Sequence, residues 1–307
     1  MLKQEMLLIL ASLFIFAFLI PACRTEKPSF KELKVKTPNV TLYARMAGNP
    51  APGQVLIAIN GGPGLSSHYM LNLDRLAGPE FAVVTYDQRG VSRSTSPPPD
   101  ASNYDLMKYV EDLAAVQKAI GVESVSLLGH SWGGLVALRY ATVYPEKVGS
   151  IVLMGSGPPT WEGIAKGQTS FGQRIQKLQQ QGIIPQDLQQ ASIEVVLPAY
   201  FSNPKFWFSP DDKGRPIEYN DTVYRLTLST LEGYDITADV AKLNHRVLIL
   251  WGEDDPFGLA MAEETKKALS QAKVKFVVLK KCGHFWHECP DEFFARVRAF
   301  LGLPAAN

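Results

Sequence analysis

Short runs of apolar, β-forming residues alternate with amphipathic helical patterns along most of this chain. Residues 55–59 and 81–86 are apolar at almost every position, as expected for strands buried on both faces of a sheet. Residues 104–120 carry apolar side chains at helical spacing and end at Gly121. The predicted strands are 33–36, 40–45, 55–59, 81–86, 125–128, 148–154, 247–251 and 274–279, and the predicted helices are 104–120, 135–144, 260–269 and 290–300. This alternation predicts an α/β fold with a mostly parallel central sheet flanked by helices.

Residues 157–240 interrupt this alternation. They are rich in Gln from 173 to 190 and in aromatic residues from 200 to 234, and no run among them reads as a buried parallel strand. We predict a mainly helical cap inserted over the carboxyl ends of the strands. The core domain would then consist of residues 24–156 and 241–307.

The amino-terminal 23 residues have a different character. Lys3 precedes an uncharged run over residues 6–20, which is short for a membrane span of ~20 residues but suits the hydrophobic region of a signal peptide. The run ends with Ala22-Cys23, and an aliphatic residue three positions before the cysteine resembles a bacterial lipoprotein box, with Pro21 as an unusual occupant. We therefore predict a signal peptide over 1–23 and a protein exported to the bacterial cell envelope, tethered to the membrane by lipid on Cys23. An uncleaved amino-terminal anchor is the alternative.

Charge and cysteine content narrow the partners. Lys and Arg total 31 against 30 Asp and Glu, a net charge of +1, so no long-range attraction to nucleic acid is expected. Of three Cys, Cys282 and Cys289 remain once Cys23 carries lipid. An exported protein could pair them, but two free, partly buried thiols are the expectation that we favour. No CxxC or Cys/His ligand spacing occurs, and so no metal is predicted.

The strongest chemical signal is Gly129-His130-Ser131-Trp132-Gly133, which joins strand 125–128 to helix 135–144. A serine at the tip of such a turn adopts strained backbone angles, and a side chain two residues away on either side would clash. The amino end of the following helix also offers N–H groups and a favourable dipole to a developing oxyanion. Ser131 is therefore the predicted nucleophile, and a structural turn with a solvated serine is the alternative.

A serine nucleophile needs a base, and the base needs an orienting carboxylate. Strand 247–251 is followed by Asp254 and Asp255, and strand 274–279 leads to His284, which directly follows a glycine. The chain order Ser, Asp, His is one known permutation of the triad. His284 is the predicted base. His287 is the alternative base, although we expect it to lie at the rim of the site. We expect His130 to point away from the site and to pack.

This constellation resembles the α/β-hydrolase superfamily over nearly the whole mature chain. The Gly-x-x-Asp pattern of that family implies Asp255, rather than Asp254, as the orienting carboxylate. Dehalogenases and epoxide hydrolases carry aspartate at the nucleophile position, so the serine at 131 implies acyl transfer.

Three segments resemble the proline iminopeptidase subfamily more closely: 60–64 (Asn-Gly-Gly-Pro-Gly), 86–94 and 129–134. The resemblance implies that the backbone N–H groups of Gly62 and Trp132 form the oxyanion hole, with the Trp132 side chain packed against the cap. Asp87 and Arg89 are expected to form a structural network. Asn60 departs from the family's histidine, and residues 91–92 depart from its small residue and second glycine.

Iminopeptidases hold the free amino group of the substrate with cap glutamates, because a cation in a partly dry pocket needs a paired anion. Glu194, Glu218 and Glu232, with Asp221, are the candidates here, although none lies in a recognisable motif.

The preferred hypothesis is an exported aminopeptidase of this type, acting on a short peptide or small molecule through an acyl-enzyme and needing no metal or organic cofactor. An esterase or lactonase for small hydrophobic acyl groups is the alternative. A non-catalytic ligand-binding protein of the same fold is a third possibility.

Overall fold

The computed structural model describes residues 30–51, 54–189, 192–207 and 217–305. The predicted signal segment and Cys23 lie outside these residues. The described chain forms an eight-stranded sheet in the order β1-β2-β4-β3-β5-β6-β7-β8. The strands are β1 (Phe30–Lys36), β2 (Thr41–Ala47), β3 (Val55–Ile59), β4 (Ala82–Tyr86), β5 (Val125–His130), β6 (Val148–Met154), β7 (Arg246–Gly252) and β8 (Lys273–Leu279). Strand β2 is antiparallel to both its neighbours, and the pairs from β4 to β8 are all parallel.

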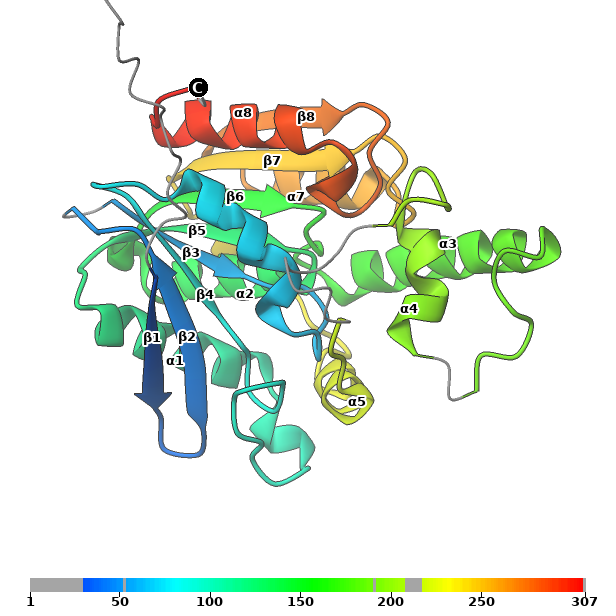
Figure 1. Ribbon diagram of the computed structural model, residues 1–307, viewed down its shortest axis with the longest axis horizontal. Helices are drawn as coiled ribbons and strands as arrows, with labels where there is room; N and C mark the ends of the chain where they lie inside the picture. Colours follow the sequence, from blue (N-terminus) through cyan, green and yellow to red (C-terminus); the bar gives the residue numbers. More distant parts are fainter. Residues whose placement is uncertain (1–29, 52–53, 190–191, 208–216, 306–307) are drawn as a thin grey trace, which may run out of the picture.

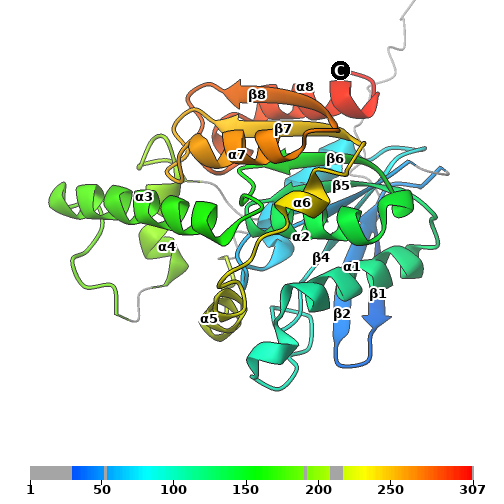
Figure 2. The same ribbon diagram turned by 180° about the vertical axis from the view of Figure 1, so that it is seen from behind.

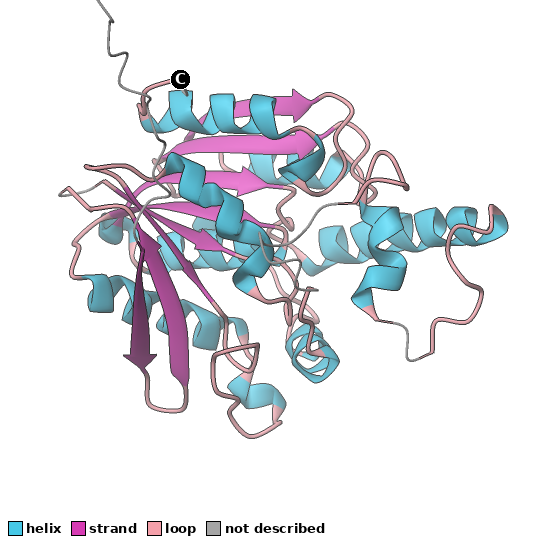
Figure 3. Ribbon diagram, in the orientation of Figure 1, coloured by secondary structure: helices cyan, strands magenta, loops and turns pink. Residues whose placement is uncertain are grey.

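Helices cover both faces of the sheet, which confirms the predicted fold class (Figures 1 and 2). One face carries α1 (Leu106–Ile120), α2 (Trp132–Val143), α6 (Thr237–Val240) and α7 (Ala260–Ala268), and the other carries the 3₁₀ helix η1 (Ser67–Leu76) and α8 (Pro290–Leu301). Short 3₁₀ turns η2 (Ala101–Asn103), η3 (Pro145–Lys147) and η5 (Trp286–Glu288) complete the core. Figure 3 shows the strands as one layer between these helices.

Strand β3 is buried on both faces, which explains its uninterrupted apolar sequence. Val55, Ile57 and Ile59 pack in the core on the α1 and α2 face, whereas Leu56 and Ala58 pack in the core on the η1 and α8 face. Because successive side chains of a strand point to opposite faces, a strand buried on both faces must be apolar throughout. The predicted core strands and helices are all present, with ends that differ by at most three residues. The 3₁₀ helix η1 was not predicted.

The regular secondary structure described in the inserted segment, residues 157–240, is helical, and loops connect the helices. The segment contains α3 (Trp161–Gln180), α4 (Ile193–Val196), the 3₁₀ turn η4 (Leu197–Tyr200), α5 (Asp221–Ser229) and α6, and its described residues add only isolated bridges to the β-structure. Figure 1 shows α3, α4 and α5 beyond the carboxyl ends of the parallel strands. In the part of the chain that the structure describes, no helix has the length and apolar character needed to span a bilayer.

Cys282 and Cys289 form a disulfide, so the expectation of two free thiols is wrong. Cys282 follows β8, and Cys289 directly precedes α8. The 3₁₀ turn η5 between them brings their Cα atoms to 5.7 Å, within the range that a disulfide requires. Sequence spacing alone could not reveal this turn.

Candidate active site

Ser131 occupies the sharp turn between β5 and α2. Its φ of 53° lies in the left-handed region, which a non-glycine residue seldom adopts. A Cβ at Gly129 would lie 2.5 Å from the Gly133 carbonyl oxygen, and a Cβ at Gly133 would lie 2.1 Å from that of Ile59. The turn therefore closes only with glycine at both positions, for the steric reason that the sequence suggested.

The amino end of α2 and the loop after β3 meet at Ser131. Trp132 is the first residue of α2, so its N–H has no partner within the helix. Gly62 has a φ of 125°, and both residues line the same cavity as Ser131. The buried Asn60 side chain donates to the carbonyl oxygens of Gly61 and Leu65, at 3.0 and 2.6 Å. Asn60, where the subfamily has histidine, thus braces the loop that carries Gly62.

The Trp132 side chain is anchored in the core. Its indole N–H donates to Gln88 Oε1 at 2.9 Å, and its ring meets Tyr109 of α1 edge-on at 5.2 Å. Both partners precede residue 157, so these two contacts fix the side chain to the core.

His284 and Asp255 form a buried pair. His284 Nδ1 lies 2.8 Å from Asp255 Oδ2, and the other carboxylate oxygen of Asp255 accepts the Phe257 N–H at 3.0 Å. Asp255 stands three residues after Gly252, the last residue of β7. The neighbouring Asp254 instead accepts from the Ser202 hydroxyl at 2.6 Å in an exposed position. The structure thus places Asp255, and not Asp254, behind the imidazole.

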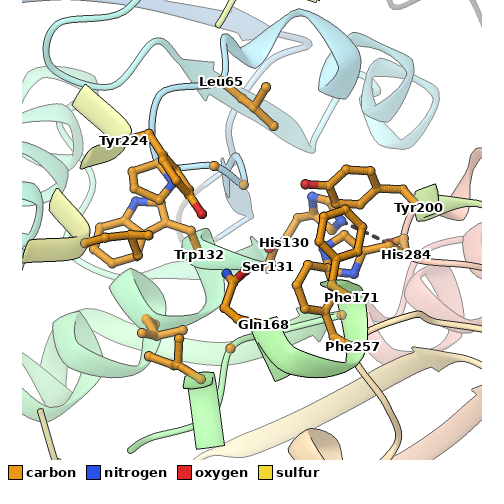
Figure 4. Close-up of a pocket in the computed structure, with 18 of the residues that line it drawn as sticks. Leu65, His130, Ser131, Trp132, Gln168, Phe171, Tyr200, Tyr224, Phe257 and His284 are labelled. Atoms are coloured by element: carbon orange, nitrogen blue, oxygen red, sulfur yellow. Dashed lines mark hydrogen bonds between the residues drawn. The ribbon is translucent and has the colours of Figure 1, made fainter. Parts of the chain in front are cut away.

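The second imidazole nitrogen of His284 is available for chemistry. Nε2 is buried and accepts or donates no hydrogen bond within the described part of the molecule, and His284 and Ser131 line one cavity (Figure 4). A neutral imidazole held by a carboxylate at Nδ1 presents an acceptor at Nε2. This arrangement can take a proton from a serine hydroxyl.

Two other histidines differ from expectation. His130 does not point away: it lines the cavity, and its ring centroid lies 4.8 Å from that of His284. His130 is the last residue of β5, and its ring extends toward the base instead of away from the site. His287 does not line the cavity, and its Nε2 donates to the Tyr69 carbonyl at 3.0 Å. Burial lowers the pKa of His287 to about 3, so its ring is neutral.

The cavity at Ser131 measures about 250 Å³ and is mostly apolar. The stacked rings of Phe171 and Phe257, 4.9 Å apart, form part of its wall with Tyr200 (Figure 4). Leu65, Leu135, Ile164, Leu228, Leu231 and Met261 also line it. Besides Ser131 and the histidines, the polar groups in the lining include the Gln168 amide and the hydroxyls of Tyr200, Tyr219 and Tyr224.

The structure does not bring the predicted amine anchors to this cavity. Glu194, Glu218 and Glu232 are absent from the described lining, as is Asp221. Glu218 is exposed and lies 3.7 Å from His68, and Asp221 pairs with Arg225 on the outside of α5. No Asp or Glu side chain of the described residues lines the cavity. An anchoring role for these carboxylates thus finds no support in the geometry.

Three supporting residues escaped the sequence analysis. A Cβ at Gly155 would lie 2.9 Å from His284 Nδ1 and 3.2 Å from Asp255 Oδ2, so the pair needs glycine after β6. Glu288 accepts from the N–H groups of Gly283 and Ser202, each at 2.8 Å, and ties the loop of the base to the inserted segment. The Tyr69 hydroxyl accepts from the Gly61 N–H in the loop after β3 and lies 2.7 Å from His130 Nδ1 at the end of β5. Only Gly155, a glycine directly after a strand, left a signal in the sequence.

Asp87 and Arg89 form ion pairs, as expected of a structural network, and both side chains are buried. Asp87 accepts from Arg93 Nε at 2.7 Å and from the Ser67 hydroxyl at 2.7 Å. Burial alone would raise the pKa of Asp87, but Arg93 and Ser67 hold it below its ordinary value. Arg89 bonds both carboxylate oxygens of Asp112 at 2.8 Å. These pairs fix the loops that carry the site.

Comparison with known proteins assigns this geometry to a family. The model of the α/β-hydrolase fold family matches residues 54–288. The chain belongs to the α/β-hydrolase family. Its described residues contain no cluster of His, Cys, Asp and Glu suited to a metal ion.

Relatives of this α/β-hydrolase include proline iminopeptidases. It is 29% identical over 268 residues to a proline iminopeptidase of Heyndrickxia coagulans, a match that spans 81% of this chain and 91% of the relative. A solved proline iminopeptidase-related protein from Thermus thermophilus is 25% identical with a TM-score of 0.71, covering 92% of this chain and 100% of that one. An esterase from Exiguobacterium antarcticum, 19% identical over 90% of this chain and 99% of its own, has a TM-score of 0.62 and shows the shared fold. The chain is thus an α/β-hydrolase similar to proline iminopeptidases.

Proposed function

We propose that this hydrolase forms an acyl-enzyme on Ser131 and acts on uncharged esters or amides with a small, apolar acyl group. The observation that carries the proposal is the cavity itself. Ser131 and the His284–Asp255 pair lie beside an apolar space of about 250 Å³ whose described lining holds no carboxylate.

In the proposed mechanism, the Ser131 hydroxyl attacks the acyl carbon while His284 Nε2 takes its proton. Asp255 keeps the Nδ1 proton of His284 in place and stabilises the imidazolium that forms. The N–H groups of Gly62 and Trp132 stabilise the oxyanion. His284 then protonates the leaving group, which departs and leaves the acyl group on Ser131. In the second half-reaction, water attacks the acyl-enzyme with His284 as the base, and the acid is released.

Charge decides between the two substrate classes. An ammonium group in a dry, apolar cavity without a paired anion loses several kcal/mol of solvation. The tyrosine hydroxyls and the Gln168 amide can donate or accept hydrogen bonds but cannot neutralise a cation. A neutral acyl group loses nothing comparable and gains from contact with Phe171, Phe257 and Tyr200.

Aminopeptidase activity is the second candidate, and the names of the relatives favour it. Curated relatives matched along most of their length are proline iminopeptidases. In that case the substrate's amino group would be held by groups other than the described carboxylates.

A matched pair of substrates separates the two candidates. The first compound is proline 4-nitroanilide, which carries a charged ring nitrogen. The second is cyclopentanecarboxylic acid 4-nitroanilide, which has the same ring size but no charged nitrogen. With this pair, or the corresponding 4-nitrophenyl esters, we expect kcat/KM at pH 7 to be at least about tenfold higher for the uncharged compound, equivalent to about 1.4 kcal/mol. A preference of tenfold or more for the prolyl compound would establish the aminopeptidase and reject the neutral-substrate proposal.

We further propose that the enzyme is exported and anchored through Cys23. The apolar run over 6–20 and the Ala22-Cys23 junction support this. The Cys282–Cys289 disulfide supports it independently, because disulfides persist in oxidising compartments outside the cytoplasm.

Lipidation can be tested in a bacterial host that is fed radiolabelled palmitate. The full chain is expected to incorporate the label and to accumulate as a larger precursor when globomycin blocks lipoprotein signal peptidase. The Cys23→Ser variant should show neither effect. Unlabelled protein recovered from the cytosol in both cases would refute the anchor.

A further inference from the structure

A buried chain of hydrogen bonds connects the loop after β3 to the loop that carries His284. The Gly61 N–H donates to the Tyr69 hydroxyl oxygen at 2.5 Å, and the Tyr69 hydroxyl lies 2.7 Å from His130 Nδ1. At the other side of the same ring, His130 Nε2 lies 3.0 Å from the carbonyl oxygen of His284. Tyr69 and His130 are 0% and 1% exposed, so both side chains are shielded from bulk water.

The chemistry of the partners gives every proton in this chain a defined place. A carbonyl oxygen only accepts, so His130 Nε2 carries a hydrogen and donates to His284. Burial holds the pKa of His130 well below its ordinary value, so the ring is neutral and Nδ1 is an acceptor. The Tyr69 hydroxyl therefore donates to Nδ1 while accepting from Gly61. Each donor has one acceptor, and all bonds run in one direction from Gly61 to His284.

The surroundings leave this chain little freedom to shift. A Cβ at Gly61 would lie 3.0 Å from both His130 Nδ1 and Ser131 Cβ, and 3.2 Å from the Tyr69 hydroxyl. The Tyr69 backbone carbonyl also accepts from His287, three residues beyond the base. Figure 4 shows His130 and His284 together on the Tyr200 side of Ser131. Tyr69 thus contacts Gly61, the neighbour of Gly62. His130 directly precedes the nucleophile in the chain and contacts the base.

We propose that Tyr69 and His130 are positioning residues that act as one unit, setting the oxyanion loop and the base loop at a fixed separation around Ser131. The inference rests on the proposed acyl-enzyme function. Neither side chain reacts in this scheme. They would act through Gly62 and His284. A displacement of such groups by about 1 Å can lower a rate by about a hundredfold.

Two substitutions cut the chain at its two ends. Tyr69→Phe removes only the hydroxyl. In His130→Asn an amide oxygen near the Nδ1 position can still accept from Tyr69, but the shorter side chain no longer reaches the His284 carbonyl. With the uncharged 4-nitrophenyl ester, we expect each variant to lose about tenfold in kcat with KM changed by less than about twofold. Since a unit broken once cannot be broken again, the double variant should also lose about tenfold rather than the hundredfold product.

Tyr140→Phe is the matched control. Tyr140 is an equally buried tyrosine in α2 whose hydroxyl donates to Gln117 at 2.5 Å, away from the cavity. We expect the loss of this hydroxyl to lower the melting temperature by about as much as Tyr69→Phe and to leave kcat unchanged. If His130→Asn does not fold, His130→Gln breaks the chain at the other bond of this residue: its amide can still donate to the His284 carbonyl, but the Tyr69 hydroxyl loses its acceptor at Nδ1, and the same tenfold loss in kcat is expected.

The outcomes separate the two proposals. Tyr69→Phe with a wild-type kcat, or single losses that multiply in the double variant, would overturn the positioning unit and leave the hydrolase function intact. A wild-type protein without ester or amide turnover would overturn both.

Discussion

Replacing Ser131 with alanine is expected to lower kcat for the uncharged ester about 10⁶-fold, to the level left by binding and the oxyanion donors alone. Alanine keeps the Cβ and therefore the same backbone strain at a φ of 53°, so the fold should be preserved. Only the hydroxyl, which lines the same cavity as His284, is lost. Stopped assays with purified protein over long incubation times measure the residual rate.

Fluorophosphonate labelling provides a second readout, since the reagent modifies an activated serine. The wild-type protein should be labelled at Ser131 and the Ser131→Ala variant should not. Ser170→Ala is the control, because Ser170 bonds the Lys166 carbonyl on α3 and does not line the cavity. Labelling that survives in Ser131→Ala, or folded wild-type protein that is never labelled, would exclude Ser131 as the nucleophile.

The elements that the sequence predicted well are those whose causes are local. Strand β3 must be apolar on both faces, and the glycines around Ser131 must be small because backbone atoms lie within 2.5 Å of where their Cβ atoms would stand. A strand followed by Gly-x-x-Asp or Gly-His likewise places a polar group at the carboxyl end of the sheet. Such patterns act over a few residues and can be read along the chain.

The features that were missed or wrongly predicted depend on distant partners. The orientation of His130 is set by Tyr69, 61 positions earlier, and by the His284 carbonyl, 154 positions later. The disulfide depends on the path of η5, and the distance of Glu194, Glu218 and Glu232 from the cavity depends on how α3, α4 and α5 pack over the sheet. No periodicity encodes these arrangements, because they result from tertiary packing.

The adjacent carboxylates Asp254 and Asp255 allow a test of the orienting role in which chemistry and position are closely matched. Asp255→Asn is expected to lower kcat about 10⁴-fold, because an amide can present an N–H group to His284 Nδ1 and so favour the tautomer that cannot take a proton at Nε2. Asp254→Asn makes the same chemical change one residue away, but its side chain faces Ser202 at the surface, and kcat should change by less than about twofold. Steady-state kinetics with the same ester, at matched melting temperatures, measure both. A large loss of kcat in Asp254→Asn with little change in Asp255→Asn would assign the orienting role to Asp254. Similar losses of kcat in both variants would indicate that the loop after β7, rather than one carboxylate, supports the base.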